Sequence, residues 1–202
     1  NISYQITGSL PFTDNPWSTI GNDWAVTHSL LSEAHLKDVV SLTDKLSKKM
    51  LGSGWKGLFG IDFMYDEERD EIRLIEINAR QPASTTFESQ IQLALRVAGI
   101  EGATTFENHL LSLTGMKLGN AIHINDGAQI VQRITQKMLD GDINPSLLPD
   151  IKAIDEAGYI AISYNNTKHN SDLIRIQSVR GIMEAHNKFN SRGKAIVELV
   201  TK

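Results

Sequence analysis

One stretch of twenty-one residues constrains the fold of this chain more than any other. Residues 60–80 read GIDFMYDEERDEIRLIEINAR, in which two short apolar segments flank a highly charged turn. Alternate side chains of a strand point to the same face, so Glu76, Asn78 and Arg80 are expected to project together. A hairpin would bring Asp62 from the first segment alongside them. The pattern therefore predicts two carboxylates, an amide and a guanidinium on one face of an antiparallel pair of strands.

These side chains have the chemistry of a site for a hard cation and an oxyanion. Asp62, Glu76 and Asn78 offer oxygen ligands without histidine or cysteine, which favours Mg²⁺ or Mn²⁺ over Zn²⁺. Two carboxylates that share a site repel each other unless a cation lies between them. A cation with so few protein ligands is expected to bind phosphates as well. Two alternatives stay open: an incidental polar face of the sheet, and an ion pair of Arg80 with Glu76 or Glu88.

The two segments resemble the C-terminal metal-binding hairpin of ATP-grasp enzymes, over residues 60–64 and 74–80. By this resemblance, Asp62, Glu76 and Asn78 hold one or two Mg²⁺ ions that bridge the phosphates of ATP. The pattern is specific, because several fixed positions fall in the right order within one predicted hairpin.

Two further residues acquire roles by the same resemblance. Met64 lies where these enzymes pack an apolar side chain under the adenine. Arg80 matches the branch that includes biotin carboxylase and carbamoyl-phosphate synthetase, in which it contacts the oxyanionic substrate or the acyl-phosphate intermediate. The D-alanine ligase branch carries an arginine two residues before the aspartate, and this chain has Gly60 at that position.

The resemblance implies an ATP- and Mg²⁺-dependent ligase that activates a carboxylate as an acyl phosphate, either a carboxylate–amine ligase or a carboxylase-like enzyme. It is firmest over residues 33–92 and does not include the first lobe, which supplies phosphate-binding lysines, a glycine-rich loop and an adenine-reading hinge. We therefore expect a fragment that is inactive and binds ATP weakly by itself. Two other functions stay open: a non-catalytic scaffold or regulatory module with this fold, and a small-molecule kinase.

The sequence predicts an α+β fold, in which an antiparallel sheet is backed by helices and followed by a smaller β-rich C-terminal extension. We expect residues 1–115 to form the C-terminal lobe of an ATP-grasp domain and residues 116–202 to form the extension. Ser32 is expected to cap the first long helix. The predicted helices cover residues 32–51, 85–98 and 105–114. The predicted strands cover residues 1–8, 57–64, 72–79, 128–134, 159–164 and 173–179.

Loops and one ambiguous segment complete this prediction. Residues 9–24 are rich in turn-forming residues and are expected to form a long loop, and a second loop is expected around Pro145 and Pro149. Residues 181–200 are expected to form a helix followed by a strand, or strand throughout.

A glycine-rich segment and several polar residues outside the hairpin have competing interpretations. Residues 52–57 read GSGWKG and match the G-x-G-x-x-G pattern, but that motif needs a strand before it and a helix after it. Here a predicted helix precedes and a predicted strand follows, which indicates a helix C-cap and a tight turn. The six histidines are scattered without metal-ligand spacing. Asp14 and Asp23, with Asn22, stay open as loop residues that face an active site.

Composition excludes several classes of protein. The 202 residues include 24 acidic and 20 basic side chains, and the isoelectric point is about 5.9, so no basic surface for nucleic acid or anionic membrane is indicated. The apolar stretches are only a few residues long, too short to span a bilayer. The absence of cysteine excludes disulfides, thiolate catalysis and cysteine-based zinc sites. We expect a cytoplasmic protein whose partners are ATP, a small carboxylate and the first lobe of the same protein; a homodimer stays open.

Overall fold

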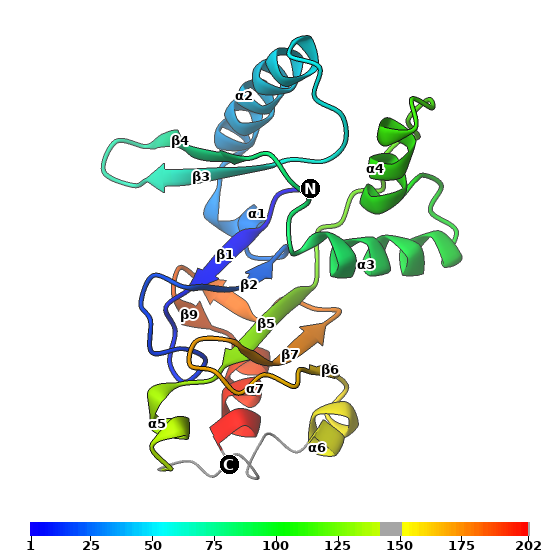
Figure 1. Ribbon diagram of the computed structural model, residues 1–202. Helices are drawn as coiled ribbons and strands as arrows, with labels where there is room; N and C mark the ends of the chain where they lie inside the picture. Colours follow the sequence, from blue (N-terminus) through cyan, green and yellow to red (C-terminus); the bar gives the residue numbers. More distant parts are fainter. Residues whose placement is uncertain (142–150, 202) are drawn as a thin grey trace. The chain divides into compact units, whose positions relative to one another are not determined.

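The chain forms two compact units in the computed structural model, which describes residues 1–141 and 151–201 (Figure 1). One unit combines Asn1–Leu30 with Ile124–Lys202, and the other is Leu31–His123. We call them the sheet unit and the hairpin unit, after their main elements.

The class of fold is confirmed as α+β, with an antiparallel sheet and packed helices. The compact units do not follow the expected boundary at residue 115. Strand β2 (Thr19–Asp23) pairs with β5 (Ala128–Arg133), so one sheet draws strands from both sides of that boundary. The pattern of predicted helices and strands along the sequence could not show this, because it carries no information about pairing between distant strands. The expected loop around Pro145 and Pro149 lies outside the described residues.

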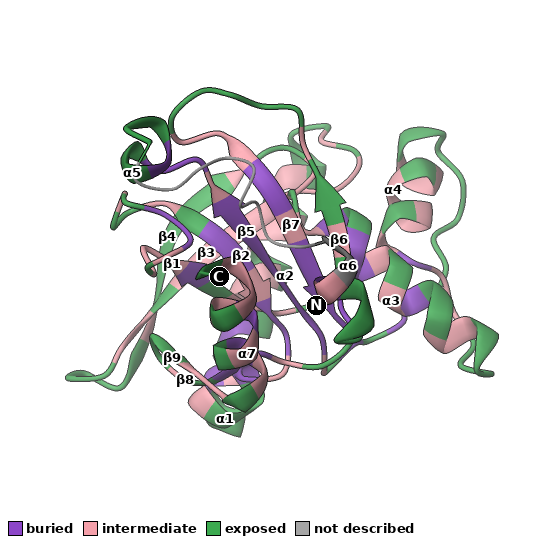
Figure 2. Ribbon diagram, turned by 90° about the horizontal axis from the view of Figure 1, so that it is seen from below, coloured by how far each residue is buried: buried purple, intermediate pink, exposed green. Residues whose placement is uncertain are grey.

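The sheet unit contains a five-stranded antiparallel sheet with the strand order β1-β2-β5-β7-β6. The remaining strands are β1 (Tyr4–Thr7), β6 (Ile160–Ser163) and β7 (Asp172–Ser178). β5 is central and buried along nearly its whole length, and β7 is largely buried beside it (Figure 2). The predicted strands in these regions are therefore confirmed, with small shifts at their ends.

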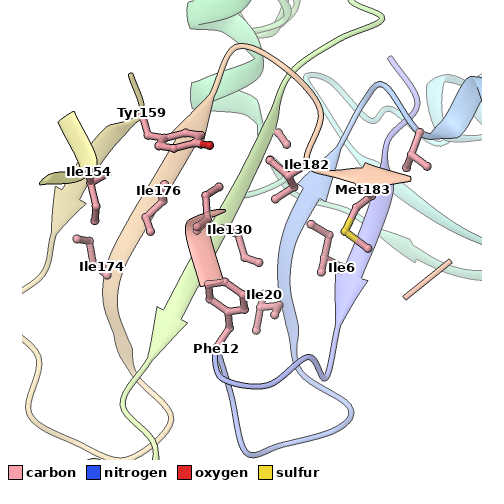
Figure 3. Close-up of a cluster of buried hydrophobic side chains, with 13 residues drawn as sticks. Ile6, Phe12, Ile20, Ile130, Ile154, Tyr159, Ile174, Ile176, Ile182 and Met183 are labelled. Carbon is pink, nitrogen blue, oxygen red and sulfur yellow. The ribbon is translucent and has the colours of Figure 1, made fainter. Parts of the chain in front are cut away.

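The main apolar core lies in the sheet unit (Figure 3). Alternate residues of the strands, such as Ile130 of β5 and Ile176 of β7, point into it, because a strand sends every second side chain to one face. Ile154 of α6 (Ile151–Glu156) and Ile196 of α7 (Ser191–Thr201) pack on the same cluster. The full set of buried members is Ile6, Phe12, Ile20, Val26, Ala128, Ile130, Ile154, Tyr159, Ile174, Ile176, Ile182, Met183 and Ile196.

The prediction for residues 181–200 is wrong in its order of elements. Two short strands, β8 (Met183–Ala185) and β9 (Lys188–Phe189), come first, and α7 follows them. Asn187 has a φ of 53°, which allows the tight turn between the strands. Asn190 Oδ1 then accepts a hydrogen bond from Gly193 N at 3.0 Å, as an N-cap does.

Three short helices of the sheet unit were not part of the prediction. They are α1 (Thr27–Leu30), α5 (Gln136–Leu139) and α6. The first two have four residues and α6 has six, which is too short for the 3.6-residue period to show in the sequence.

A buried carboxylate holds two distant parts of the sheet unit together. Asp23, at the end of β2, is 0% exposed. Its Oδ1 accepts hydrogen bonds from Ala25 N (2.8 Å) and Val26 N (2.9 Å). Its Oδ2 accepts from Ile182 N (2.6 Å) and Met183 N (2.9 Å). A buried charge needs such partners, and its complete burial means that Asp23 does not face a ligand.

Replacement of this carboxylate should destabilise the protein strongly. Asp23→Ala leaves four backbone N–H groups without an acceptor, and each unsatisfied buried donor is costly, so we expect a loss of about 3–5 kcal/mol of unfolding free energy. Urea denaturation of the chain measures this loss. Asp155→Ala, at an exposed position of α6, is the control and should cost less than about 0.5 kcal/mol. Equal effects of the two variants would contradict the prediction.

The hairpin unit contains the remaining long elements, and the predicted helices and hairpin are confirmed there. They are α2 (Glu33–Gly52), β3 (Gly60–Asp66), β4 (Glu71–Asn78), α3 (Thr85–Val97) and α4 (Thr105–Leu113). Ser32 caps α2 as predicted, because its Oγ accepts from His35 N at 3.2 Å. His35 Nδ1 accepts in turn from Ser32 N at 3.2 Å, which completes a reciprocal capping box.

Polar contacts fix the corner between α3 and α4. Gln92 is fully buried, and its Nε2 donates to Ile122 O (2.6 Å) while its Oε1 accepts from Thr105 N (2.7 Å). Nearer the surface, Arg96 donates two hydrogen bonds to Glu107, at 2.8 and 2.9 Å. These bonds, together with the N–H of Thr104, lower the pKa of Glu107 to about 2.

The Arg96–Glu107 pair should make stability depend on pH in the acid range. The pKa of Glu107 is about 2 in the folded chain and 4.5 in its ordinary state, so the contribution is complete above about pH 4.5 and is lost as the pH falls towards 2. The side chains are 36% and 41% exposed, so solvent screening keeps this contribution small. Glu107→Gln should lower the melting temperature at pH 6 and match the unchanged protein near pH 2. A difference in melting temperature between the two proteins that stays constant from pH 6 to pH 2 would contradict the assignment.

Candidate functional site

The hairpin brings the three predicted metal ligands together. Gly60 pairs with Asn78 and Asp62 pairs with Glu76 across β3 and β4. Asn78 Nδ2 donates to Asp62 Oδ2 at 3.0 Å and to Glu76 Oε1 at 2.9 Å. The strand period thus predicted their convergence correctly, and their role as metal ligands stays a prediction.

The arrangement of these three groups suits a hard cation. The amide nitrogen of Asn78 lies within hydrogen-bond distance of both carboxylates, at a point where positive charge is favoured. Rotation of the amide by half a turn would present its oxygen on the same side, which gives an all-oxygen ligand set. Within the part of the chain that the structure describes, no group of three or more His, Cys, Asp or Glu is placed to hold a metal. The group on the hairpin consists of two carboxylates and one amide.

Arg80 lies beside this group, and its guanidinium makes long hydrogen bonds to uncharged groups. Its Nη2 donates to Asn78 Oδ1 and its Nη1 to Gln81 O, both at the long distance of 3.5 Å. Residues 1–141 and 151–201 contain no ion pair of Arg80, so the alternative pairing with Glu76 or Glu88 is absent. Glu88 is instead buried and accepts a hydrogen bond from Thr105 Oγ1. The exposed guanidinium of Arg80 is therefore able to bind an oxyanion.

A β-bulge interrupts the hairpin immediately beyond the ligand pair. Asp62 pairs with Glu76, but the next residue of β3, Phe63, pairs with Leu74. Ile75 is therefore an extra residue in β4 without a partner of its own. Bulges of this kind are frequent next to functional sites, where they redirect a side chain.

The bulge places Arg73 on the same face as the ligand group. β3 keeps its regular alternation, so Met64 shares a face with Asp62, and Met64 pairs with Arg73. Arg73 Nε lies 3.4 Å from Asp66 Oδ2, and its Nη2 donates to Glu71 Oε2 at 3.2 Å. Met64 is 56% exposed and its nucleotide role stays a prediction. Sequence reasoning missed Arg73, because a regular hairpin would pair Leu74 with Met64.

The opposite face of the hairpin packs against α2, as Figure 1 shows. The ring of Tyr65 lies 4.7 Å from that of His35, and His35 Nε2 lies 3.0 Å from Asp70 Oδ1. Tyr65 donates a hydrogen bond to the same Asp70 at 2.8 Å, which raises the pKa of Tyr65. These contacts leave the face with Asp62 and Met64 directed away from α2.

The glycine-rich segment before the hairpin has a structural role. α2 ends at Gly52 and β3 follows, so the order is helix, turn, strand, as expected for a C-cap. Gly57 has a φ of 89°, and its N–H donates to Ser112 Oγ at 2.9 Å. Leu58 N donates to His109 Nδ1 at 3.0 Å, so one of the scattered histidines fixes this turn.

The loop predicted for residues 9–24 is wrong in its last part, because β2 covers Thr19–Asp23 and includes Asn22; the polar residues of both parts belong to the sheet unit. Asp14 Oδ2 accepts from Gln136 N at 2.8 Å and lies 3.0 Å from His169 Nε2. These two groups lower the pKa of Asp14. Asn22 Nδ2 donates to Ser3 Oγ at 3.1 Å. The contacts give these residues structural roles, and a role in ligand binding stays a prediction for Asp14 and Asn22.

The fold of this chain is similar to that of solved ATP-grasp enzymes, so the expected fold is confirmed. One is the phosphoribosylaminoimidazole carboxylase ATPase subunit from Aquifex aeolicus, with a TM-score of 0.56 and 16% identity over 98% of this chain and 50% of that chain. Another is the ADP complex of PurK, N5-carboxyaminoimidazole ribonucleotide synthetase, with a TM-score of 0.56 and 9% identity over 90% of this chain and 41% of that chain.

The chain therefore spans half or less of these two solved proteins. No protein-family model matches it, and no curated protein matches it. At these identities the likeness establishes the fold alone, and membership of the biotin carboxylase and carbamoyl-phosphate synthetase branch stays a prediction. Among the described helices, none is long and apolar enough to cross a membrane.

Proposed function

We propose that this chain is the part of an ATP-dependent carboxylate ligase that binds Mg²⁺ and the nucleotide. One observation carries the proposal: Asp62, Glu76 and Asn78 converge on one face of a hairpin, in a fold shared with ATP-grasp enzymes. One of those enzymes was solved with ADP, which supports nucleotide binding by the same fold. The absence of histidine and cysteine from the group supports Mg²⁺ or Mn²⁺ as the metal.

Different residues of the proposed site would bind the metal, the nucleotide and the substrate. Asp62, Glu76 and Asn78 would hold the metal, which when bound neutralises the β- and γ-phosphates during transfer. Met64 offers an exposed apolar surface next to this group, on which an adenine ring can pack. Arg80 offers a planar fork of donors that fits a carboxylate or an acyl phosphate.

The proposed reaction has two steps. An oxygen of the substrate carboxylate attacks the γ-phosphorus of ATP, the bond from that phosphorus to the bridging oxygen breaks, and ADP leaves with the electron pair. An amine then attacks the carbonyl carbon of the acyl phosphate and expels inorganic phosphate, with loss of a proton from the amine. Arg80 would stabilise the negative charge of the carboxylate in the first step and of the phosphate in the second.

Removal of a metal ligand should abolish turnover without unfolding the protein. In the protein that contains this chain, Asp62→Ala or Glu76→Ala should lower kcat by about 10³-fold or more, since the metal provides several kcal/mol of transition-state stabilisation. An assay of ADP release with Mg²⁺ measures turnover, and circular dichroism checks the fold.

Glu68→Ala, in the exposed turn of the same hairpin, is the matched control and should keep normal turnover. Normal activity of the Asp62/Glu76 double variant would exclude the proposed metal site.

The chain by itself should bind nucleotide weakly. It spans half or less of the related structures, so the remaining contacts of a nucleotide clamp lie on the other part of such a protein. Calorimetry with Mg²⁺ and ATP should give a Kd above about 1 mM for the chain alone. A Kd in the micromolar range would show that the chain needs no other lobe to bind ATP.

A further inference from the structure

We propose, on the basis of the function above, that Arg73 contacts the nucleotide and forms the base end of its binding site together with Met64. The guanidinium would lie flat against the purine ring that packs on Met64. Neither the sequence pattern nor the fold comparison assigns a role to Arg73.

The register of the hairpin places Met64 and Arg73 next to the proposed metal ligands. The Met64–Arg73 pair follows the Asp62–Glu76 pair on the same face, two residues further along β3. Two residues of a strand span about 6.8 Å. A nucleotide with its phosphates at the Asp62–Glu76 pair would therefore extend its ribose and base over the Met64–Arg73 pair.

Two carboxylates hold the guanidinium of Arg73 in place. Asp66 contacts its Nε at 3.4 Å and Glu71 contacts its Nη2 at 3.2 Å, which fixes the plane of the guanidinium. These two are its ion-pair partners among the described residues, and they engage Nε and Nη2 of the group. The side chain is 43% exposed. A planar cation held in this way is suited to stack on an aromatic ring.

The hairpin face that contains Asp62 and Met64 is rich in negative charge. Four carboxylates share it, from Asp62, Asp66, Glu71 and Glu76, and Arg73 is the cation of β4 among them. A nucleotide is an anion, so a positive group at the base end lowers the repulsion where the metal is too distant to act. If Arg73 served only to offset the carboxylates, its loss would reduce stability and leave nucleotide affinity unchanged.

Kinetics and binding of Arg73 variants test the proposal. In the protein that contains this chain, Arg73→Ala should raise the KM for ATP and the Kd for ADP by about tenfold, with kcat changed less than twofold. Arg73→Lys keeps the charge but loses the plane, so it should raise both constants by a smaller factor. Calorimetry with ADP and Mg²⁺ gives the Kd without turnover.

Arg69→Ala is the matched control. Arg69 lies in the turn and contacts the same carboxylate, Asp66, at 3.7 Å, but it is outside the paired strands. Its KM for ATP and Kd for ADP should equal those of the unchanged protein. Unchanged constants in Arg73→Ala, with or without a lower melting temperature, would overturn the proposal.

Glu76→Ala in the same assay separates this proposal from the proposed function. Loss of turnover in Glu76→Ala together with unchanged constants in Arg73→Ala would reject only the role of Arg73. Normal turnover in Glu76→Ala would reject the metal site on which both proposals depend.

Discussion

The pairing register of β3 with β4 decides which side chains share a face of the hairpin. Side chains alternate with a period of two, so a shift of one residue in one strand moves all its later side chains to the other face. The bulge at Ile75 makes this shift between the Asp62–Glu76 pair and the Met64–Arg73 pair. A regular register would place the apolar Leu74 where Arg73 now lies. The bulge therefore sets the chemistry of the face beyond the metal ligands.

A two-stranded hairpin is only marginally stable without further packing, so its support matters for the precision of the site. That support comes from one side: His35 completes the capping box of α2, contacts the ring of Tyr65 and pairs with Asp70 in the turn. The other face keeps the apolar side chain of Met64 in solvent, where it is 56% exposed. This division fits a hairpin that is held by a helix on one face and bound by a ligand on the other.

The sequence was sufficient for elements with a strong period and for residues that alternate within one strand. The helix α2 and the convergence of Glu76 with Asn78 are of this kind. It was insufficient where tertiary contacts override local preference. β2 contains Gly21, Asn22 and Asp23, which are poor strand formers. β5 approaches this strand so closely that a Cβ on Gly21 would lie 2.2 Å from Gln129 O. The pairing with β5 and the buried hydrogen bonds of Asp23 stabilise β2 in spite of its residues. The face on which Arg73 lies was not predictable for a related reason, because a bulge is a property of two strands together.

If the proposed site binds a nucleotide, the distribution of charge on the hairpin face would make its two ends bind by different means. At the phosphate end, Asp62 and Glu76 would repel the phosphates of ATP, and only a cation between them turns that repulsion into attraction. At the base end, Met64 and Arg73 offer apolar surface and a cation of their own, and need no metal. Affinity for the phosphates should therefore depend steeply on Mg²⁺, whereas the contribution of the base end should not. Arg80 adds a second cation beside Asn78, where a substrate anion would approach without competing for the metal.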